Sequence, residues 1–361
     1  MTYRNSSDTL KIAKRFMIGV IKISATIKDV AKYTGLSIAT ISKYLNGGNV
    51  LEKNRIKIEE AIRELNFRRN ELARGLKTNQ TMTVGILIPT LENNFFTTII
   101  SHIENILLKN RYSTIICVYR EDFNLEKEKL SFLVNKKVDG IIMAPHGRDW
   151  QHIQQVLDQD IPVVLIDRMI KELECDTILT DNSNAAYNAV EQFIIGGHRR
   201  IGIITGPKDI YTTAERLKGY IRVHEDYGLE IDESLILYGN YDVESGYSQL
   251  EKFIKMKNPP TAVFVTNYDM TLGAVMAINE NNIRIPDQLS FIGFDNLQLA
   301  RVIKPAPSIV VQPMEGIGKL AAKTLLNRMK GDKVNFPSVY RLKTKLIIGD
   351  SIRPLMTEID K

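Results

Sequence analysis

The sequence has little cysteine and no long apolar run. Its two cysteines, Cys117 and Cys175, are too few for the disulfide framework of a small secreted protein. Cys117 lies in an apolar run, so we expect it to be a buried small side chain. No apolar segment approaches the roughly 20 residues of a membrane-spanning helix. The stretch MIGVI ends at Lys22 and is shorter than the roughly 7–15 apolar residues of a signal peptide. These absences argue against a secreted or membrane-spanning protein.

Motifs of catalysis are also lacking. The five histidines show no pair at the spacing of metal ligands on a helix. No nucleophile elbow occurs. The segment 316–319 has glycines and a lysine but lacks the spacing of a phosphate-binding loop, so we interpret it as structural. The sequence therefore predicts neither an enzyme nor a bound cofactor or metal ion.

The basic charge is concentrated at one end of the chain. Residues 1–80 contain 16 Lys and Arg against 7 Asp and Glu, whereas the remainder contains 32 against 35. A basic N-terminal segment on a mildly acidic body is typical of a nucleic-acid-binding domain attached to another unit. A length of 361 residues also predicts two or three units, because one ordinary core rarely spans so much chain.

Residues 26–46 have the pattern of two short amphipathic helices joined by a tight turn. Gly35 suits the left-handed conformation that ends the first helix, and Ser37 is a good N-cap for the second. Helices joined so closely cross steeply, which is typical of a helix-turn-helix whose second helix enters the DNA major groove. The predicted apolar faces consist of Ile27, Val30, Ala31 and Thr34 in the first helix and Ile38, Ile41 and Leu45 in the second.

A third helical stripe follows and predicts a small three-helix core. It consists of Ile58, Ala61, Ile62 and Leu65. Amphipathic helix pairs occur in many helical proteins, so the spacing alone leaves a purely structural bundle open.

From residue 82 onward, short β-branched runs alternate with helical stretches. Most of these runs are apolar throughout, as parallel strands covered on both faces should be. The alternation predicts a βαβ series with right-handed crossovers. The predicted strands are 84–88, 114–118, 140–144, 163–167, 201–205, 262–266 and 290–294, with helices such as 96–110, 184–196 and 269–281.

Several segments of the chain form a highly specific combination. In the first part they are TIKDVAKYTGLSIATISKYLN, IEEAIRELNF and NELARGLKT. They continue as VGILIP, VDGIIM, PVVLIDR, GGHRRIGIITG, RLKGY, PTAVFVTN and LSFIGFDN. In these segments the chain resembles the lac repressor family (LacI/GalR) of bacterial transcription regulators. The resemblance covers nearly the whole chain.

The resemblance implies an α/β fold with a small all-α helix-turn-helix headpiece. The remainder would be a two-lobed, periplasmic-binding-protein-like domain of doubly wound parallel sheets. Residues 1–24 would be an appended tail or a misassigned start, with Met17 a candidate start. The implied parts are a headpiece at 25–68, a hinge helix and linker at 69–81, and an effector-binding and dimerisation domain at 82–355. Within that domain, lobe 1 would be about 82–181 and 312–342, and lobe 2 about 182–311 and 343–355.

The resemblance also implies which headpiece residues meet DNA. Ile38, Ala39 and Thr40 align with base-contacting positions, and Lys43 with another one turn later. Apolar side chains can contact only groups such as the thymine methyl, whereas Lys43 can donate to guanine or to a phosphate. An alternative for Ile38 is that it belongs to the headpiece core. The expected phosphate contacts, which position the headpiece without reading sequence, are Thr26, Ser37 and Asn46.

A hinge helix is implied just after the headpiece. Leu76 matches a leucine that wedges between base pairs in the minor groove, and Arg74 and Lys77 flank it within reach of phosphates. Such a wedge unstacks one base step and gains contacts from the resulting bend. The alternative is a plain linker with one stray leucine.

Most residues implied to bind an effector follow strands, because ligands of such folds bind at the carboxyl ends of strands. Gln312 lies where the chain would cross again between the lobes. A sugar has hydroxyls around its rim and a C–H face, so a paired Arg and Asp with an aromatic ring suits it. Arg168 has the alternative role of a strand-end salt bridge, and Asp295 that of a turn residue. Ile210, at a position commonly used by purine-binding relatives, weakens a purine effector. The implied set is Phe95, Phe96, Arg168, Thr212, Arg216, Tyr241, Asp295 and Gln312.

The sequence thus predicts a bacterial, cytoplasmic, homodimeric regulator, with repression as its expected action. Its expected partners are double-stranded operator DNA and a small effector, a sugar or sugar phosphate, with no membrane and no cofactor. Three alternatives stay open. They are a solute-binding protein, an enzyme of nucleotide or sugar metabolism on a similar scaffold, and a catabolite-control regulator that answers to a phosphoprotein.

Overall fold

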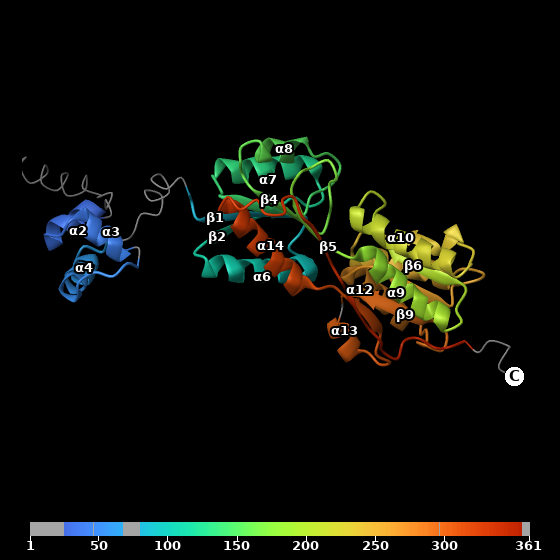
Figure 1. Cartoon of the computed structure of the whole chain (residues 1–361). Helices are drawn as coiled ribbons and strands as arrows, with labels where there is room; N and C mark the ends of the chain where they lie inside the picture. Colours follow the sequence, from blue (N-terminus) through green and yellow to red (C-terminus); the bar gives the residue numbers. More distant parts are fainter. Residues whose placement is uncertain (1–24, 46, 68–79, 296, 356–361) are drawn as a thin grey trace, which may run out of the picture. The chain divides into compact units, whose positions relative to one another are not determined.

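A computed structural model describes residues 25–45, 47–67, 80–295 and 297–355 (Figure 1). The chain separates into two compact units, residues 1–81 and 82–361, which are described one at a time. The predicted tail at 1–24 and the predicted DNA contacts Asn46, Arg74, Leu76 and Lys77 lie outside the described residues.

In the described part of the first unit, three helices form a bundle: α2 (Ile27–Thr34), α3 (Ile38–Leu45) and α4 (Glu52–Glu64). The predicted helix boundaries are confirmed. Gly35 ends α2 with a φ of 68°, and the Ser37 hydroxyl accepts a 3.2 Å hydrogen bond from the Thr40 amide at the start of α3. Val30, Ile41, Ile58 and Ala61 are fully buried at the centre of the bundle. This arrangement confirms the predicted helix-turn-helix with a third supporting helix.

Ile38, which the sequence placed on the apolar face of the second helix, is not buried in the core. Ile38 is 46% exposed, whereas Ile41 on the same helix has no exposed area. Ile38 is the first residue of α3, so its side chain projects beyond the region that α2 and α4 cover. Its assignment to the core stripe was therefore wrong, and the side chain is available to a partner.

Two six-stranded sheets form the second unit. The first has the order β11-β5-β4-β3-β1-β2, with β1 at Thr83–Ile88, β2 at Ser113–Val118, β3 at Gly140–Met143, β4 at Val163–Ile166, β5 at Asp176–Thr180 and β11 at Val339–Leu342. The second has the order β12-β10-β9-β8-β6-β7, with β6 at Ile201–Thr205, β7 at Ile236–Tyr238, β8 at Ala262–Val265, β9 at Ser290–Phe294, β10 at Ser308–Val311 and β12 at Lys345–Ile347. All pairings are parallel except that of β10 with β12.

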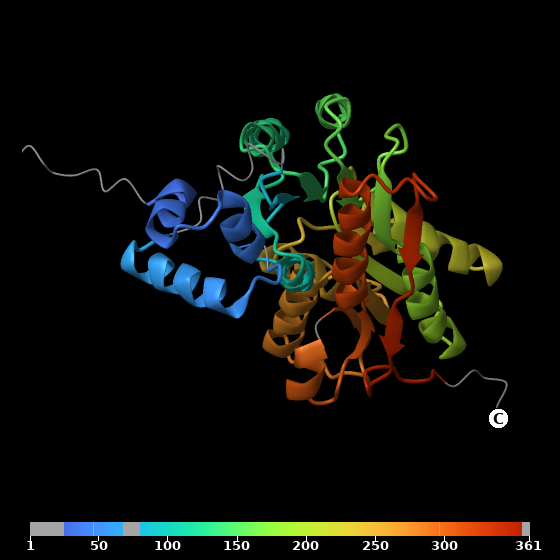
Figure 2. The ribbon, with the colours of Figure 1, turned by 60° about the vertical axis from the view of Figure 1, so that its left-hand side comes forward.

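Helices cover both faces of each sheet, because alternate apolar residues of the central strands point to opposite sides. On the first sheet, α6 (Asn94–Lys109) and α14 (Met314–Met329) share one core, and α7 (Phe123–Asn135) and α8 (Gln151–Leu157) share the other (Figures 1 and 2). On the second sheet, α9 (Asn182–Ile195) and α10 (Tyr211–Asp226) lie opposite α11 (Val243–Ile254) and α12 (Tyr268–Glu280). The short helix α13 (Leu297–Val302) follows β9. The predicted doubly wound α/β fold is confirmed.

The chain passes three times between the two sheets. It leaves the first sheet between β5 and α9, returns between β10 and α14, and leaves again between β11 and β12. These crossings fit the predicted pair of lobes. None of the described helices is both long and apolar enough to cross a membrane.

Candidate functional site

A cavity of about 520 Å³ lies within the second unit, at the carboxyl ends of strands from both sheets. Strand ends of parallel sheets leave such crevices open to ligands. All eight side chains predicted to bind an effector line this cavity, namely Phe95, Phe96, Arg168, Thr212, Arg216, Tyr241, Asp295 and Gln312.

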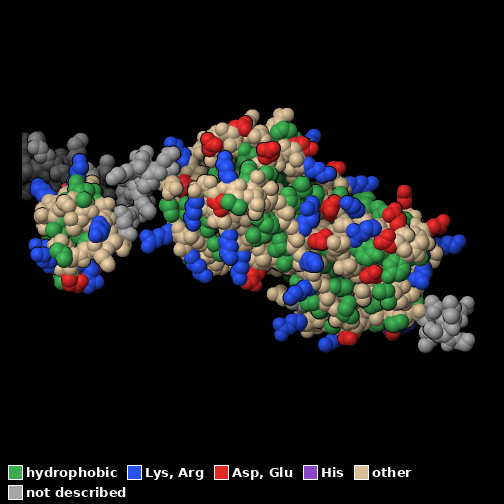
Figure 3. Space-filling model, viewed as in Figure 1, with side chains coloured by type: hydrophobic (Ala, Val, Ile, Leu, Met, Phe, Trp, Pro, Cys, Tyr) green, Lys and Arg blue, Asp and Glu red, His purple; other side chains and the backbone are tan. Residues whose placement is uncertain are grey.

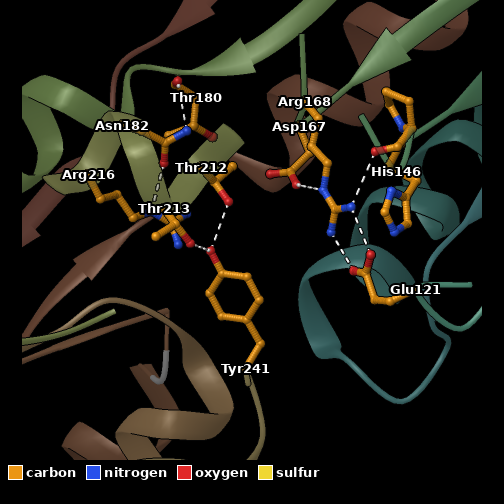
Figure 4. Close-up of polar contacts among 12 residues, drawn as sticks. Glu121, His146, Asp167, Arg168, Thr180, Asn182, Thr212, Thr213, Arg216 and Tyr241 are labelled. Atoms are coloured by element: carbon orange, nitrogen blue, oxygen red, sulfur yellow. Dashed lines mark hydrogen bonds and ion pairs between the residues drawn. The ribbon is translucent and has the colours of Figure 1, made fainter. Parts of the chain in front are cut away.

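Arg168, which follows β4, has both of its terminal nitrogens bonded within the chain (Figure 4). Its Nη2 donates to Glu121 Oε1 at 2.5 Å and its Nη1 to Glu121 Oε2 at 3.0 Å, which makes a bidentate pair. Nη1 also donates to the Tyr119 hydroxyl and to the Pro145 carbonyl. The strand-end salt bridge that the sequence left open is therefore present. Its partner Glu121 was not predicted, because no local pattern marks an acid 47 residues away as a partner.

Asp295, at the end of β9, is bound by Gln312. Its Oδ1 accepts a 2.9 Å hydrogen bond from the backbone amide of Gln312, and its Oδ2 accepts a 2.6 Å hydrogen bond from the side-chain Nε2 of Gln312. Burial raises the pKa of Asp295 to about 6, although both hydrogen bonds oppose that rise. Asp295 has a φ of 60°, a left-handed conformation that a turn accepts, but its carboxylate bonds Gln312 and caps no turn among the described contacts. Each carboxylate oxygen keeps a second lone pair that a ligand can use.

Gln312 and Arg216 connect this site to the chain crossings. The Gln312 carbonyl oxygen accepts a 2.7 Å hydrogen bond from the Thr180 hydroxyl, at the end of β5. Arg216 on α10 donates from Nε to Asn182 at 2.8 Å and from Nη1 to the Thr266 carbonyl at 2.6 Å. Its guanidinium carbon also lies 4.2 Å from the centre of the Phe294 ring. Two of its nitrogens are thus used within the chain, which leaves Nη2 for a ligand.

Tyr241 supplies the aromatic face on the side of the second sheet. Its hydroxyl forms hydrogen bonds with Thr212 at 3.0 Å and Thr213 at 2.7 Å (Figure 4). The ring lies directly over Gly206, where an added Cβ would come within 2.0 Å of it. A glycine is therefore needed at the end of β6, a requirement that the sequence analysis did not anticipate.

Phe95 and Phe96 serve the core as well as the cavity. Their rings meet edge to face at 5.1 Å, and each residue is 6% exposed. Both belong to the core beneath the first sheet, on α6. We therefore expect them to shape the apolar floor of the cavity and to offer little area to a ligand.

Carboxylates outnumber cations in the cavity lining. Seven carboxylates line it, against the two guanidinium groups of Arg168 and Arg216. Asp269, at the start of α12, accepts a 3.2 Å hydrogen bond from Asn93, which precedes α6. Burial raises the pKa of Asp269 to about 6, and the negative charge of Asp242 adds to the rise. Within the described part of the chain, no group of three or more His, Cys, Asp or Glu is placed to hold a metal ion.

The predicted DNA contacts of the first unit lie on its surface. Thr26, Ser37, Ile38, Ala39 and Lys43 are exposed, and Thr40 is half-buried against the Ser37 hydroxyl at 2.9 Å. Both Thr26 and Ser37 lie at helix N-termini. The Asp29 carboxylate accepts from the Thr26 backbone amide at 2.8 Å, and the Ser37 hydroxyl accepts from the Thr40 backbone amide at 3.2 Å. Lys and Arg side chains are visible on the face of this unit in Figure 3.

Two families of known proteins match this chain. Residues 26–70 match the bacterial regulatory proteins of the lacI family, and residues 190–352 match the periplasmic binding protein-like domain. Catabolite control protein A of Priestia megaterium is 33% identical over 92% of this chain and 100% of its own length. The ribose operon repressor of Haemophilus influenzae is 32% identical over 92% of this chain and 99% of its own.

A solved structure extends the likeness in fold to most of the chain. The lac repressor dimer, bound to operator and the anti-inducer ONPF, superposes with a TM-score of 0.81 at 23% identity. It covers 91% of this chain and 99% of that one.

The raised pKa of Asp269 predicts a pH-dependent stability. Folding makes this carboxyl harder to ionise, so its contribution to the free energy of unfolding is full below its ordinary pKa of 3.8 and is lost as pH rises through about 6. Asp269→Asn stays neutral and can still accept from Asn93. We therefore expect it to raise the urea midpoint at about pH 7 and to have no such effect at about pH 4.

Asp287→Asn, at an exposed position, provides the matched control. Urea titrations of the three proteins across this pH range measure the effect. A constant difference between Asp269→Asn and the unsubstituted protein at all pH values would contradict the assignment.

Proposed function

The chain belongs to the lacI family of bacterial regulatory proteins, and from this we propose that it binds a pseudo-palindromic operator as a homodimer, under the control of a small sugar held in the cavity. As in its relatives, the chain is a DNA-binding transcriptional regulator with an effector-binding domain. Operator DNA of a bacterium lies in the cytoplasm, so we propose that the protein is also located there. Repression is the proposed action, because the ribose operon repressor is a relative.

The observation that carries the sugar proposal is the meeting of Tyr241, Arg216 and Asp295 in one cavity. An aromatic ring covers the C–H face of a sugar, and the Arg and Asp satisfy its hydroxyl rim as donor and acceptor. Ile210 contributes an apolar side chain to the same lining, which disfavours a purine because a purine needs polar partners at its edge.

Effector and operator are proposed to be coupled through the crossings between the two sheets. A ligand on Asp295 and Arg216 contacts the same residues that bond Gln312 and Asn182 at those crossings, and Gln312 in turn accepts from Thr180. Contacts that differ between two lobe angles shift the equilibrium between them. The operator must then change effector affinity by the same factor by which the effector changes operator affinity.

DNA reading is proposed to rest on the start of α3. Ile38 and Ala39 are exposed and apolar, so they suit thymine methyl groups, and the exposed Lys43 suits guanine. Leu76, Arg74 and Lys77 remain the proposed minor-groove contacts and lie outside the described residues.

The headpiece match disfavours a pure solute-binding protein. The relatives named above are regulators, so an enzyme on this scaffold is also disfavoured. The similarity to catabolite control protein A supports the alternative that the chain is a catabolite-control regulator. A regulator of that kind would answer to a protein partner rather than to a sugar alone.

Lys43→Ala tests the reading of DNA sequence. If Lys43 contacts a guanine, the variant should lose about 1–3 kcal/mol of discrimination at one operator position. Operator selection from a random pool, followed by fluorescence anisotropy, measures this preference. Lys53→Ala, at an exposed position on α4, is the control. An unchanged preference, with uniform weakening and a salt slope smaller by about 1, would make Lys43 a phosphate contact instead.

A thermal-shift screen with unmodified sugars and their phosphate esters tests the effector proposal. A ligand at about 100 times its Kd should stabilise the native state by about 2.7 kcal/mol, which raises Tm by several degrees. The same ligand should change operator affinity in anisotropy measurements. Asp295→Ala should abolish both responses, and Asp295→Asn should weaken them while keeping the volume of the side chain. A normal response in Asp295→Ala would remove this residue from the site.

A further inference from the structure

The guanidinium group of Arg168 in the cavity lining is paired with the carboxylate of Glu121. Arg168 is 3% exposed, and both of its terminal nitrogens donate to the carboxylate of Glu121. The remaining nitrogen, Nε, has no hydrogen-bond partner and lies 3.7 Å from Asp167 Oδ2. A planar guanidinium fork of this kind is the preferred partner of a ligand carboxylate or phosphate. Glu121 thus takes the place that such a group would take.

Glu121 stands on a turn that is separate from the elements carrying the other effector contacts. It lies between β2 and α7, where Arg120 and Glu121 both have a φ of 53°. Two consecutive left-handed residues other than glycine are unfavourable, so the surrounding contacts must hold this turn. The Glu121 side chain is 44% exposed, so solvent reaches it while its carboxylate stays on Arg168. Figure 4 shows Glu121 and Tyr241 apart from one another, with Arg168 beside Glu121.

The rest of the lining offers an anionic ligand no second guanidinium fork. Arg216 already donates from Nε to Asn182 and from Nη1 to a backbone carbonyl, so only its Nη2 remains for a ligand. The other charged lining residues are carboxylates, and no lysine lines the cavity. A ligand phosphate would therefore add negative charge to an already negative cavity, whereas a neutral sugar would not.

We propose that Glu121 sets the charge specificity of the cavity by occupying Arg168, so that the effector is a sugar that carries neither phosphate nor carboxylate. This inference rests on the proposed sugar effector and narrows the two classes, sugar and sugar phosphate, to one. Specificity would then come from repulsion between the Glu121 carboxylate and an anionic ligand, as well as from favourable contacts with a neutral sugar.

Glu121→Gln tests the proposal, because it removes the charge that occupies Arg168 and keeps nearly the same volume. Glu92→Gln is the matched control. Glu92 also lines the cavity and is exposed, so its substitution changes the cavity charge equally without uncovering Arg168. Isothermal titration calorimetry of each protein with a set of pentoses and hexoses, and with the phosphate ester of each, gives the ratio of the two affinities.

The unsubstituted protein should bind its best sugar about tenfold or more tightly than the phosphate ester of that sugar. Glu121→Gln should reduce this ratio by about tenfold or more, mainly through stronger binding of the ester. Glu92→Gln should change the ratio by less than about threefold. If Glu121→Gln does not fold, Glu121→Ala should give the same change in ratio.

Two results would overturn the proposal. One is a preference of the unsubstituted protein for the phosphate ester. The other is an equal change in the ratio for Glu121→Gln and Glu92→Gln, which would make total charge rather than Arg168 responsible. If no sugar or ester binds any of the proteins while operator binding is intact, the sugar effector itself is wrong. That outcome is separate from a failure of charge specificity, although this inference then falls with it.

Discussion

The Gln312 side chain joins the end of one sheet to the end of the other, and the effector proposal depends on that link. Its carbonyl oxygen accepts from Thr180, the last residue of β5, and its amide nitrogen donates to Asp295 after β9. Thr180 precedes one crossing between the sheets, and Gln312 itself lies on another. All three side chains are buried, so each hydrogen bond would be costly to leave unmade. A change in the angle between the sheets must therefore rearrange the hydrogen bonds that link Thr180, Gln312 and Asp295.

The same residues face the cavity. Asp295, Gln312 and Arg216 line it, and Arg216 reaches the first crossing through Asn182. A ligand that binds these residues acts directly on the crossings between the two sheets, because the residues form the hydrogen bonds of those crossings. Coupling between distant sites often lacks such a physical connection. Here a contiguous set of hydrogen bonds provides one within the second unit.

Much of the fold was predictable because its signals are local. Buried parallel strands read as apolar runs, so seven strands were found from runs such as 84–88 and 290–294. Of the remaining strands, β5 is fully buried but begins and ends with polar residues, β10 has only four residues, and β7, β11 and β12 are partly exposed. Val339 and Tyr340 of β11, for example, are 42% and 37% exposed, and the sequence around them shows no apolar run. Lobe assignment and ligand residues came from resemblance to a family rather than from pattern.

What the sequence did not reveal depends on contacts between distant residues. Glu121 follows an arginine in a polar turn and pairs with Arg168 only because the parallel strands β2 and β4 end on the same side of one sheet, with β1 and β3 between them. Gly206 is required only because the Tyr241 ring lies on it. Ile38 follows the apolar spacing of α3, yet its position at the first turn leaves it exposed. In each case the deciding interaction is tertiary, and local periodicity does not encode it.

The most direct test of this account is the distance between the two lobes in solution, with and without a bound sugar. Both native cysteines would be replaced, and a new cysteine at each of the exposed positions Lys136 and Lys257 would carry a spin label. Double electron-electron resonance would then measure the distance between the two labels within one protomer. Excess unlabelled chain would keep each dimer to one labelled protomer. The account predicts that a saturating sugar shifts the distance distribution, and that Gln312→Ala broadens the distribution without ligand. An unchanged distribution in the unsubstituted protein, at sugar concentrations that calorimetry shows to be saturating, would contradict it.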